Sequence, residues 1–265
     1  MRDAAQQQGG KVNRLMLYLL CLVGNLLFVS SLWPERALEG SLGVLLLAFG
    51  LALWGCLSLR SGIWCRAKWR GPADRPQVAL TYDDGPDPVA TPLLLDLLQE
   101  RGVSATFFCV GDKVRAHPQV MRRMRDEGHS LGNHSNRHSN WTNFYGTGRM
   151  QAEIGAAQEA FEDVLGLRPE FYRPPIGLAN HALGVVTASL GMTIVGWQVR
   201  GFDLPGSDPS KVARRVLKGL RPGGVVLLHD GNRDPQAVLE ATALVLDGLE
   251  TRQLQPVTLK TLFSL

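Results

Sequence analysis

The sequence lacks paired cysteines, and its C-terminal part lacks any excess of charge. The four cysteines form no CxxC pair, so neither a disulfide framework nor a cysteine-ligated metal site is indicated. From residue 76 onward there are 19 basic and 20 acidic residues, and this balance gives no electrostatic reason to expect nucleic-acid binding. Internal repeats and low-complexity tracts are also missing. What remains is a chain of 265 residues, 45% of them apolar, which is enough for one large domain and a small appendage.

Two long uncharged runs lie near the N-terminus. Residues 15–33 and 40–59 each match the roughly 20 residues that a helix needs to cross a bilayer. The segment 34–39 between them leaves room only for a tight turn. We therefore predict a flexible N-terminus over 1–14 and a transmembrane helical hairpin over 15–59. A cleaved signal peptide would have a shorter apolar core and a small-residue cleavage site.

Lysine and arginine gather on the two outer flanks of the predicted hairpin, whereas its loop carries only Arg36, between two glutamates. The positive-inside rule therefore predicts a multi-pass protein of the cytoplasmic membrane, with the C-terminal domain on the cytoplasmic face. Segment 60–76 is expected to be a basic juxtamembrane linker close to membrane lipid. The flanking basic residues are Arg2, Lys11, Arg14, Arg60, Arg66, Lys68 and Arg70.

From residue 77 onward, strand-like and helix-like stretches alternate. The apolar run 77–82 predicts a buried strand, 89–101 a helix that Gly102 ends, and 104–110 the next strand. The same alternation continues to the C-terminus and indicates βα units around a parallel sheet or barrel. Polar residues cluster where these strands end, which is where α/β folds form their sites.

Two of these clusters carry groups that bind metal ions. The motif TYDDGP (81–86) places two adjacent carboxylates at a strand end, which is costly unless they are used, although Asp-Gly-Pro is also common turn chemistry. The motif HSNRH (134–138) holds two histidines four residues apart, which can converge on one ion or lie solvated in a loop. Asp84, His134 and His138 together form a ligand set that suits Zn²⁺, with Co²⁺, Mn²⁺ or Fe²⁺ as alternatives.

Two further polar motifs follow later strands. The motif RPPIG (173–177) either forms a rigid turn with a solvated arginine or lets Arg173 pair with a site carboxylate. The motif LLHD (227–230) puts His229 directly after a buried apolar run. That histidine either ends the strand or lies at the functional end of the domain.

Taken together, in this order and spacing, the four motifs resemble those of the polysaccharide deacetylase family, also called the NodB homology domain or carbohydrate esterase family 4. The resemblance runs from about Gln77 to the C-terminus. It implies an α/β fold, a distorted (β/α) barrel over 77–265. It also implies a metal-dependent hydrolase that removes an N-acyl group, typically N-acetyl, from an amino sugar.

The resemblance also assigns catalytic roles. Asp83 would be the general base and His229 the general acid. Arg173 would orient Asp83, and Asp203 would pair with His229. The metal ligands would be Asp84, His134 and His138.

Substrate contacts are implied as well. The backbone N–H of Tyr82 would stabilise the oxyanion, and Leu228 would line the pocket for the acyl methyl group. Pro175 and Trp197 would also contact the sugar. No organic cofactor is expected.

Three positions depart from the usual family pattern. Ile176 and Leu204 stand where aromatic residues are common, and Arg200 replaces a common aspartate. The loss of aromatic platforms argues against a long polymer such as chitin or peptidoglycan as the substrate. We therefore favour a polyprenyl-phosphate-linked amino sugar at the cytoplasmic face. The alternatives are an extracytoplasmic deacetylase of peptidoglycan or exopolysaccharide and a catalytically inactive sugar- or lipid-binding protein.

Overall fold

A parallel sheet organises the C-terminal domain. The computed structural model describes residues 21–25, 28, 31, 37–231 and 234–264. Over these residues the strands form a nine-stranded sheet in which every pair is parallel. In spatial order they are β1 (Ala67–Lys68), β6 (Thr193–Val195), β5 (Phe171–Tyr172), β4 (Ser130–Asn133), β3 (Thr106–Cys109), β2 (Gln77–Gly85), β8 (Val225–His229) and β7 (Val199–Arg200), with β9 (Gln255–Pro256) beside β2.

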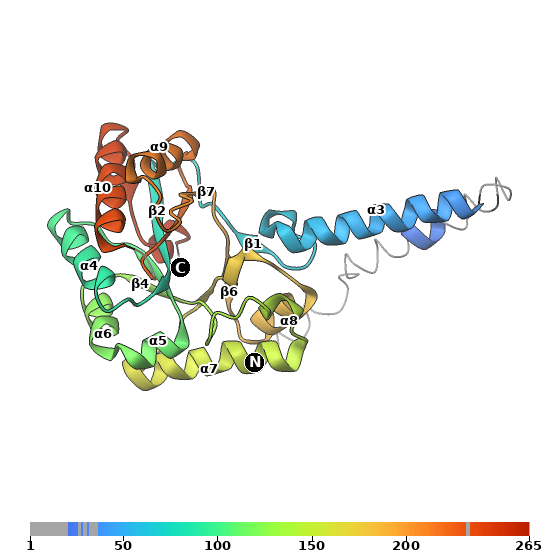
Figure 1. Cartoon of the computed structure of the whole chain (residues 1–265), viewed down its shortest axis with the longest axis horizontal. Helices are drawn as coiled ribbons and strands as arrows, with labels where there is room; N and C mark the ends of the chain where they lie inside the picture. The colour runs from blue at the N-terminus through green and yellow to red at the C-terminus, as the bar shows by residue number, and fades with distance from the viewer. Residues whose placement is uncertain (1–20, 26–27, 29–30, 32–36, 232–233, 265) are drawn as a thin grey trace.

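Helices connect the strands and cover the outside of the sheet (Figure 1). Two of them begin with an aspartate cap followed by proline, at Asp208 and Asp234, which satisfies free N–H groups of the first turn. The helices are α4 (Ala90–Glu100), α5 (Gly111–Ala116), α6 (Pro118–Asp126), α7 (Thr147–Leu165), α8 (His181–Ser189), α9 (Pro209–Gly219), α10 (Pro235–Thr251) and α11 (Leu259–Leu262), with the 3₁₀ turns η2 (Leu59–Ser61), η3 (Thr142–Phe144) and η4 (Pro175–Gly177).

The central strand β2 separates the apolar core from the polar interior of the sheet. Successive side chains of a strand point to opposite faces. Leu80 and Tyr82 enter the main core among side chains of α4 and α10. Thr81 and Asp83, on the other face, are buried and contact Arg173. The inner face of the sheet therefore carries a buried polar cluster.

The run 193–200 gives the sheet its curvature. Its first part, β6, pairs with β1 and β5, and its last part, β7, pairs with β8 on the other side of the sheet. The sheet therefore curls into a half-barrel around its polar inner face. The predicted alternation and the α/β fold class are confirmed.

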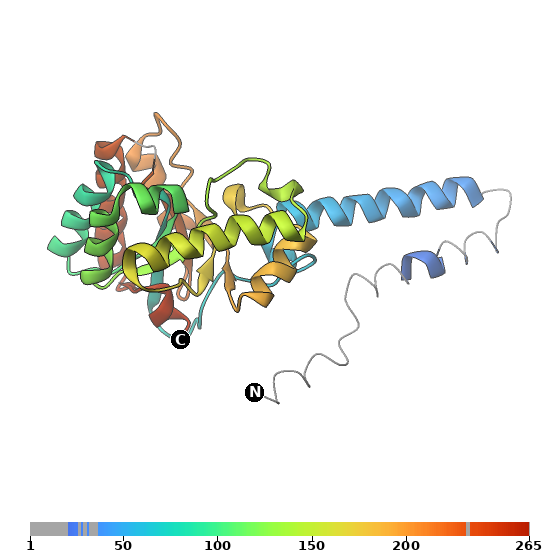
Figure 2. The same ribbon diagram turned by 90° about the horizontal axis from the view of Figure 1, so that it is seen from below.

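A long apolar helix, α3 (Ala37–Leu57), projects from the domain (Figures 1 and 2). In the part of the chain that the structure describes, Leu38–Leu57 is the one helical stretch long and apolar enough to cross a membrane, and 6% of its apolar window is buried. The predicted N-terminus 1–14 lies outside the described residues. So does the predicted helix 15–33, apart from residues 21–25, 28 and 31. The two-helix hairpin therefore stays a prediction.

The segment expected to be a linker, 60–76, instead packs on the domain. It supplies β1, which adds to the edge of the sheet beside β6, and Cys65 is buried in a secondary core. Two contacts hold the end of α3: the Ala179 N–H donates to the Cys56 carbonyl at 3.0 Å, and the Arg60 Nη2 donates to the Trp197 carbonyl at 2.7 Å. The many basic and polar residues of this segment suggested a solvated linker, whereas its few apolar side chains pack against the domain.

Candidate active site

A bulge at the end of β2 turns two neighbouring carboxylates toward one pocket. The pairing of β2 with β3 shifts register between Asp83 and Gly85, and Asp84 between them has φ = 72°. A bulge inserts one extra residue and re-aims its side chain, and left-handed backbone at a non-glycine residue is typical of functional sites. Asp83 and Asp84 therefore both line the pocket, although they are adjacent in a strand.

Asp84 lies against two histidines from the loop after β4. Its Oδ1 is 3.4 Å from His134 Nε2 and 3.1 Å from His138 Nε2. His138 also has a left-handed backbone, with φ = 52°, and its N–H donates to the Ser135 hydroxyl at 3.0 Å. One potential ligand atom from each of the three side chains lies within 4.8 Å of the others. The structure thus brings together the three predicted metal ligands.

Hydrogen bonds from neighbouring groups act on both kinds of ligand, the carboxylate and the imidazole. Burial opposes ionisation of Asp84, but hydrogen bonds with His134 and His138 outweigh it and hold the pKa of that carboxyl well below its usual range. His134 Nδ1 lies 2.7 Å from the Arg173 carbonyl. The carbonyl can only accept a hydrogen bond, so Nδ1 carries a proton, and in the neutral imidazole Nε2 keeps its lone pair for a metal ion.

Arg173 holds Asp83 from inside the half-barrel. Its side chain is fully buried, and its Nη1 donates to Asp83 Oδ1 at 2.6 Å and to the Thr81 hydroxyl at 2.7 Å. Its Nε donates to the Val195 carbonyl at 3.2 Å. The guanidinium also lies 4.0 Å from the centre of the Phe108 ring. Asp83 is therefore fixed in one orientation by a buried, well-bonded partner.

Replacing Arg173 with methionine is expected to lower the free energy of unfolding by about 3–5 kcal/mol, because Asp83 would stay buried without its counter-charge. Urea denaturation followed by circular dichroism measures the loss. Adding Asp83→Asn should recover part of it. As a control, Arg168→Met removes an exposed ion pair with Glu162 and should cost less than about 1 kcal/mol. Equal midpoints for the Arg173 and Arg168 variants would refute the interpretation.

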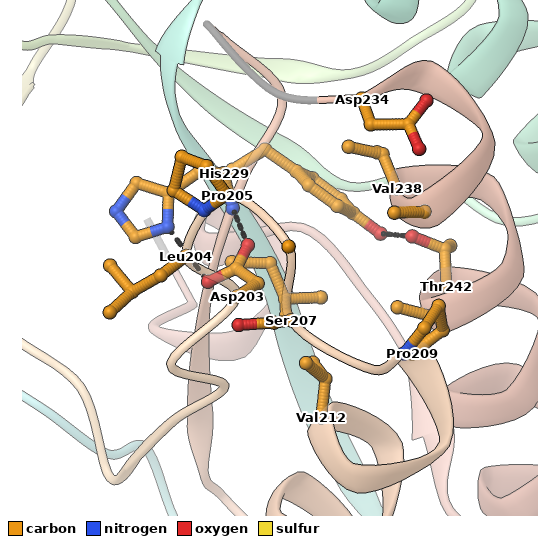
Figure 3. Close-up of a pocket in the computed structure, with 15 residues that line it drawn as sticks. Asp203, Leu204, Pro205, Ser207, Pro209, Val212, His229, Asp234, Val238 and Thr242 are labelled. Carbon is orange, nitrogen blue, oxygen red and sulfur yellow. Dashed lines mark hydrogen bonds and ion pairs between the residues drawn. The ribbon is translucent and has the colours of Figure 1, made fainter.

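His229 is held from the opposite side of the pocket. Asp203 Oδ1 lies 2.9 Å from its Nδ1, and Asp203 Oδ2 accepts its backbone N–H at 2.7 Å. Figure 3 shows this double contact at the edge of a cavity between the 203–209 loop and α10. The predicted pair is present, and it leaves Nε2 as the ring nitrogen that Asp203 does not bind.

The pocket that contains the metal-ligand triad has a volume of about 150 Å³. Of the four predicted substrate contacts, Trp197 lines it. Tyr82 and Leu228 line the neighbouring cavity of Figure 3 instead, and Pro175 is buried in η4. Four further residues line the pocket: Gly177 and Leu227, which sequence reasoning did not single out, and Ile176 and Arg200, which it noted only as departures from the family pattern.

The backbone of Tyr82 is poorly placed for the predicted oxyanion contact. Tyr82 sits between Phe107 and Leu228 in the middle of the sheet, so its amide belongs to the ladder. Ile176 offers a better donor: it lines the pocket, has φ = 62°, and its N–H donates to no residue that the structure describes. A non-glycine residue with left-handed backbone cannot be recognised from sequence, which explains why it was missed.

Comparisons with known proteins agree with this geometry. A family model described as polysaccharide deacetylase matches residues 70–195. A peptidoglycan-N-acetylglucosamine deacetylase of Bacillus cereus is 32% identical over 198 residues, which cover 73% of this chain and 91% of that protein. This chain belongs to the polysaccharide deacetylase family. The family resemblance seen in the sequence motifs is therefore confirmed.

Two further similarities bear on this member of the polysaccharide deacetylase family. A chitooligosaccharide deacetylase of Sinorhizobium fredii is 38% identical over 162 residues, covering 59% of this chain and 73% of that one. The solved structure of a peptidoglycan N-acetylglucosamine deacetylase has a TM-score of 0.70 and 31% identity, covering 74% of this chain and 92% of that chain. These relatives are named for glycan substrates, so the similarities lend no support to the argument against a polymer.

Proposed function

We propose that this chain hydrolyses the N-acyl group, normally N-acetyl, of an amino sugar with the help of a divalent metal ion. One observation carries the proposal: in a chain of a deacetylase family, the Asp84–His134–His138 triad shares a single pocket with Asp83 and His229. A carboxylate held by Arg173 and a histidine held by Asp203 supply an acid–base pair next to the metal ligands.

The three ligands fit a hard or borderline divalent cation. Two imidazole nitrogens and one carboxylate, with open positions, suit Zn²⁺, and Co²⁺, Mn²⁺ and Fe²⁺ accept the same donors. When bound, such a cation polarises an acyl carbonyl and lowers the pKa of an adjacent water. His134, Asp84 and His138 would hold it.

The remaining side chains supply the proton transfers. Asp83, fixed by Arg173, would accept the proton of the attacking water. The Ile176 N–H would donate to the oxygen that becomes negative during attack. His229, supported by Asp203, would donate a proton to the departing amine nitrogen through Nε2, because an unprotonated amide nitrogen leaves very slowly.

Several features favour a substrate held at a membrane surface. A cavity of about 270 Å³, lined by residues 57–60 at the end of α3, shares Gly177 and Trp197 with the catalytic pocket. The turn η3 also lies beside this region. The Asn180 side chain donates to the carbonyls of Asn143 and Tyr145, in and after η3, and the N–H of its neighbour Ala179 donates to the Cys56 carbonyl at the end of α3. Two aromatic rings are exposed there, that of Trp141, which directly precedes η3, at 68% and that of Phe144 at 77%. Exposed aromatic side chains of this kind favour the interface between lipid and water.

We therefore place a polyprenyl-phosphate-linked amino sugar first among the candidate substrates. Peptidoglycan or exopolysaccharide is the second candidate, because relatives are named for peptidoglycan and chitooligosaccharides. Mass spectrometry of membrane lipids and of cell-wall glycans, with and without the protein, distinguishes them. A deacetylated lipid-linked sugar supports the first, and a change confined to the polymer supports the second. Sugar binding without turnover would favour an inactive binding protein.

The proposed anchor is a two-helix hairpin with the domain on the cytoplasmic face. Its support is the charge distribution: basic residues flank both outer ends of the predicted hairpin, as the positive-inside rule requires of cytoplasmic segments. In cells, a C-terminal green fluorescent protein fusion should fluoresce, and a C-terminal alkaline phosphatase fusion should stay inactive. Phosphatase activity of the second fusion would place the domain outside and would remove the support for a cytoplasmic substrate.

A further inference from the structure

Arg200 brings a positive charge into the catalytic pocket. It ends β7, where it pairs with Leu227 of β8, and both residues line the pocket together with the metal-ligand triad. The family commonly has an aspartate at this position. The exchange of a carboxylate for a guanidinium reverses the sign of the charge at the wall that faces the substrate.

The other charged groups at the site are paired. Arg173 bonds to Asp83, the two histidines contact Asp84, and His229 bonds to Asp203. The side chain of Arg200, in contrast, forms no hydrogen bond or ion pair with any residue in the described part of the chain, and its buried Nε has no hydrogen-bond partner. Its one contact of note is with the Phe202 ring, whose centre lies 5.0 Å from Cζ. A partly buried guanidinium without an acceptor is costly.

We propose that Arg200 binds an anionic substituent of the acylated amino sugar, a phosphate or a carboxylate. This rests on the proposed function and deepens it, because it specifies that the substrate carries a negative charge. The planar guanidinium matches the geometry of both oxyanions and forms two parallel hydrogen bonds to either. A sugar phosphate linked to a lipid carrier and an acidic sugar within a glycan both present such a group.

The contact with the Phe202 ring does not by itself explain why an arginine occupies position 200. Arg215 lies over the same ring, 5.2 Å from its centre, and its Nη1 donates to the Gly201 carbonyl at 2.5 Å. Arg215 is therefore a matched control: it has the same charge and the same aromatic neighbour, but it has a hydrogen-bond acceptor and does not line the pocket. Arg60, in the adjoining cavity, already donates to the Trp197 and Gln198 carbonyls.

The test compares Arg200→Gln and Arg215→Gln on three acetylated sugars: the neutral methyl glycoside of N-acetylglucosamine, N-acetylglucosamine 1-phosphate and N-acetylmuramic acid. Amine release gives kcat/KM. A charge-assisted pair contributes about 10- to 100-fold, so Arg200→Gln should lower kcat/KM by that factor on one anionic sugar. The loss on the neutral sugar should be smaller by about the same factor, because that sugar offers no oxyanion. Which anionic sugar is affected distinguishes phosphate from carboxylate. Arg215→Gln should change none of the three.

Binding of the same sugars, measured by calorimetry, separates this inference from the proposed function. Absence of turnover on every sugar, with anion binding that depends on Arg200, would refute the proposed function alone. Equal losses on neutral and anionic sugars, or no dependence on Arg200 in either measurement, would overturn the inference. The anionic preference should also shrink as the salt concentration rises, because salt screens a partly exposed pair.

Discussion

Replacing Asp83 with asparagine is expected to lower kcat on an acetylated amino sugar by about 10³-fold, within the range for loss of a general base. The amide keeps the size of the carboxylate but cannot accept the proton of the attacking water. Asp83 is not one of the three triad residues, so the metal content should be unchanged. Amine release and metal analysis of the same preparation measure both quantities.

The matched control for this experiment is Asp87→Asn. Asp87 follows the same motif, but its Oδ1 accepts the N–H groups of Val89 and Ala90 at the start of α4, and asparagine caps a helix equally well. Its kcat should equal that of the wild type. An Asp83→Asn enzyme that kept its kcat within about fivefold would exclude Asp83 as the base, given how much general-base catalysis contributes.

Removing the metal ion is expected to reduce turnover by at least about 10³-fold, since carbonyl polarisation and water activation together supply several kcal/mol. Dialysis against a chelator followed by one equivalent of Zn²⁺ should abolish and restore activity. Burial lowers the pKa of His134, but the negative charges of Asp83 and Asp84 outweigh it and raise that pKa overall. A metal needs the neutral imidazole. Affinity for the metal should therefore fall as the pH falls.

Two variants test which residues hold the ion. His138→Gln should lower both metal content and activity, because it removes one of the three triad side chains. His181→Gln, an exposed histidine at the start of α8, should change neither. Full activity in a preparation shown by elemental analysis to be metal-free would disprove the metal mechanism.

The element order was readable from sequence because apolar runs and helix boundaries are local signals. The prediction that 77–82 is a strand holds, since β2 covers Gln77–Gly85. The polar residues at strand ends were readable for the same reason, and the parallel sheet brings them together at one edge. This is why Asp83, Asp84, His134 and His229 could be named before the structure was known.

What could not be read is set by backbone geometry and by distant contacts. The bulge at Asp84 and the left-handed backbone at Ile176 are imposed by neighbouring strands and loops. Neither position is a glycine, so the sequence gives no sign of the unusual backbone. Tyr82 belongs to the strongest motif, yet its side chain points into the core and bonds to Thr242. Arg200 was noticed only as a departure from the family pattern. Its lack of a partner depends on residues far away in the sequence.

The bonded junction between α3 and the domain has a consequence for how substrate reaches the enzyme. Hydrogen bonds of Cys56 and Arg60 join the end of the helix to the loops that form the pocket wall. The helix is therefore connected to the domain by a bonded junction and not by a free linker. If α3 crosses the bilayer, the catalytic groups work at one fixed height above it. A sugar carried on a lipid reaches a pocket at that height by diffusing within the plane of the membrane, whereas a free glycan chain must reach it by diffusing through solution in three dimensions.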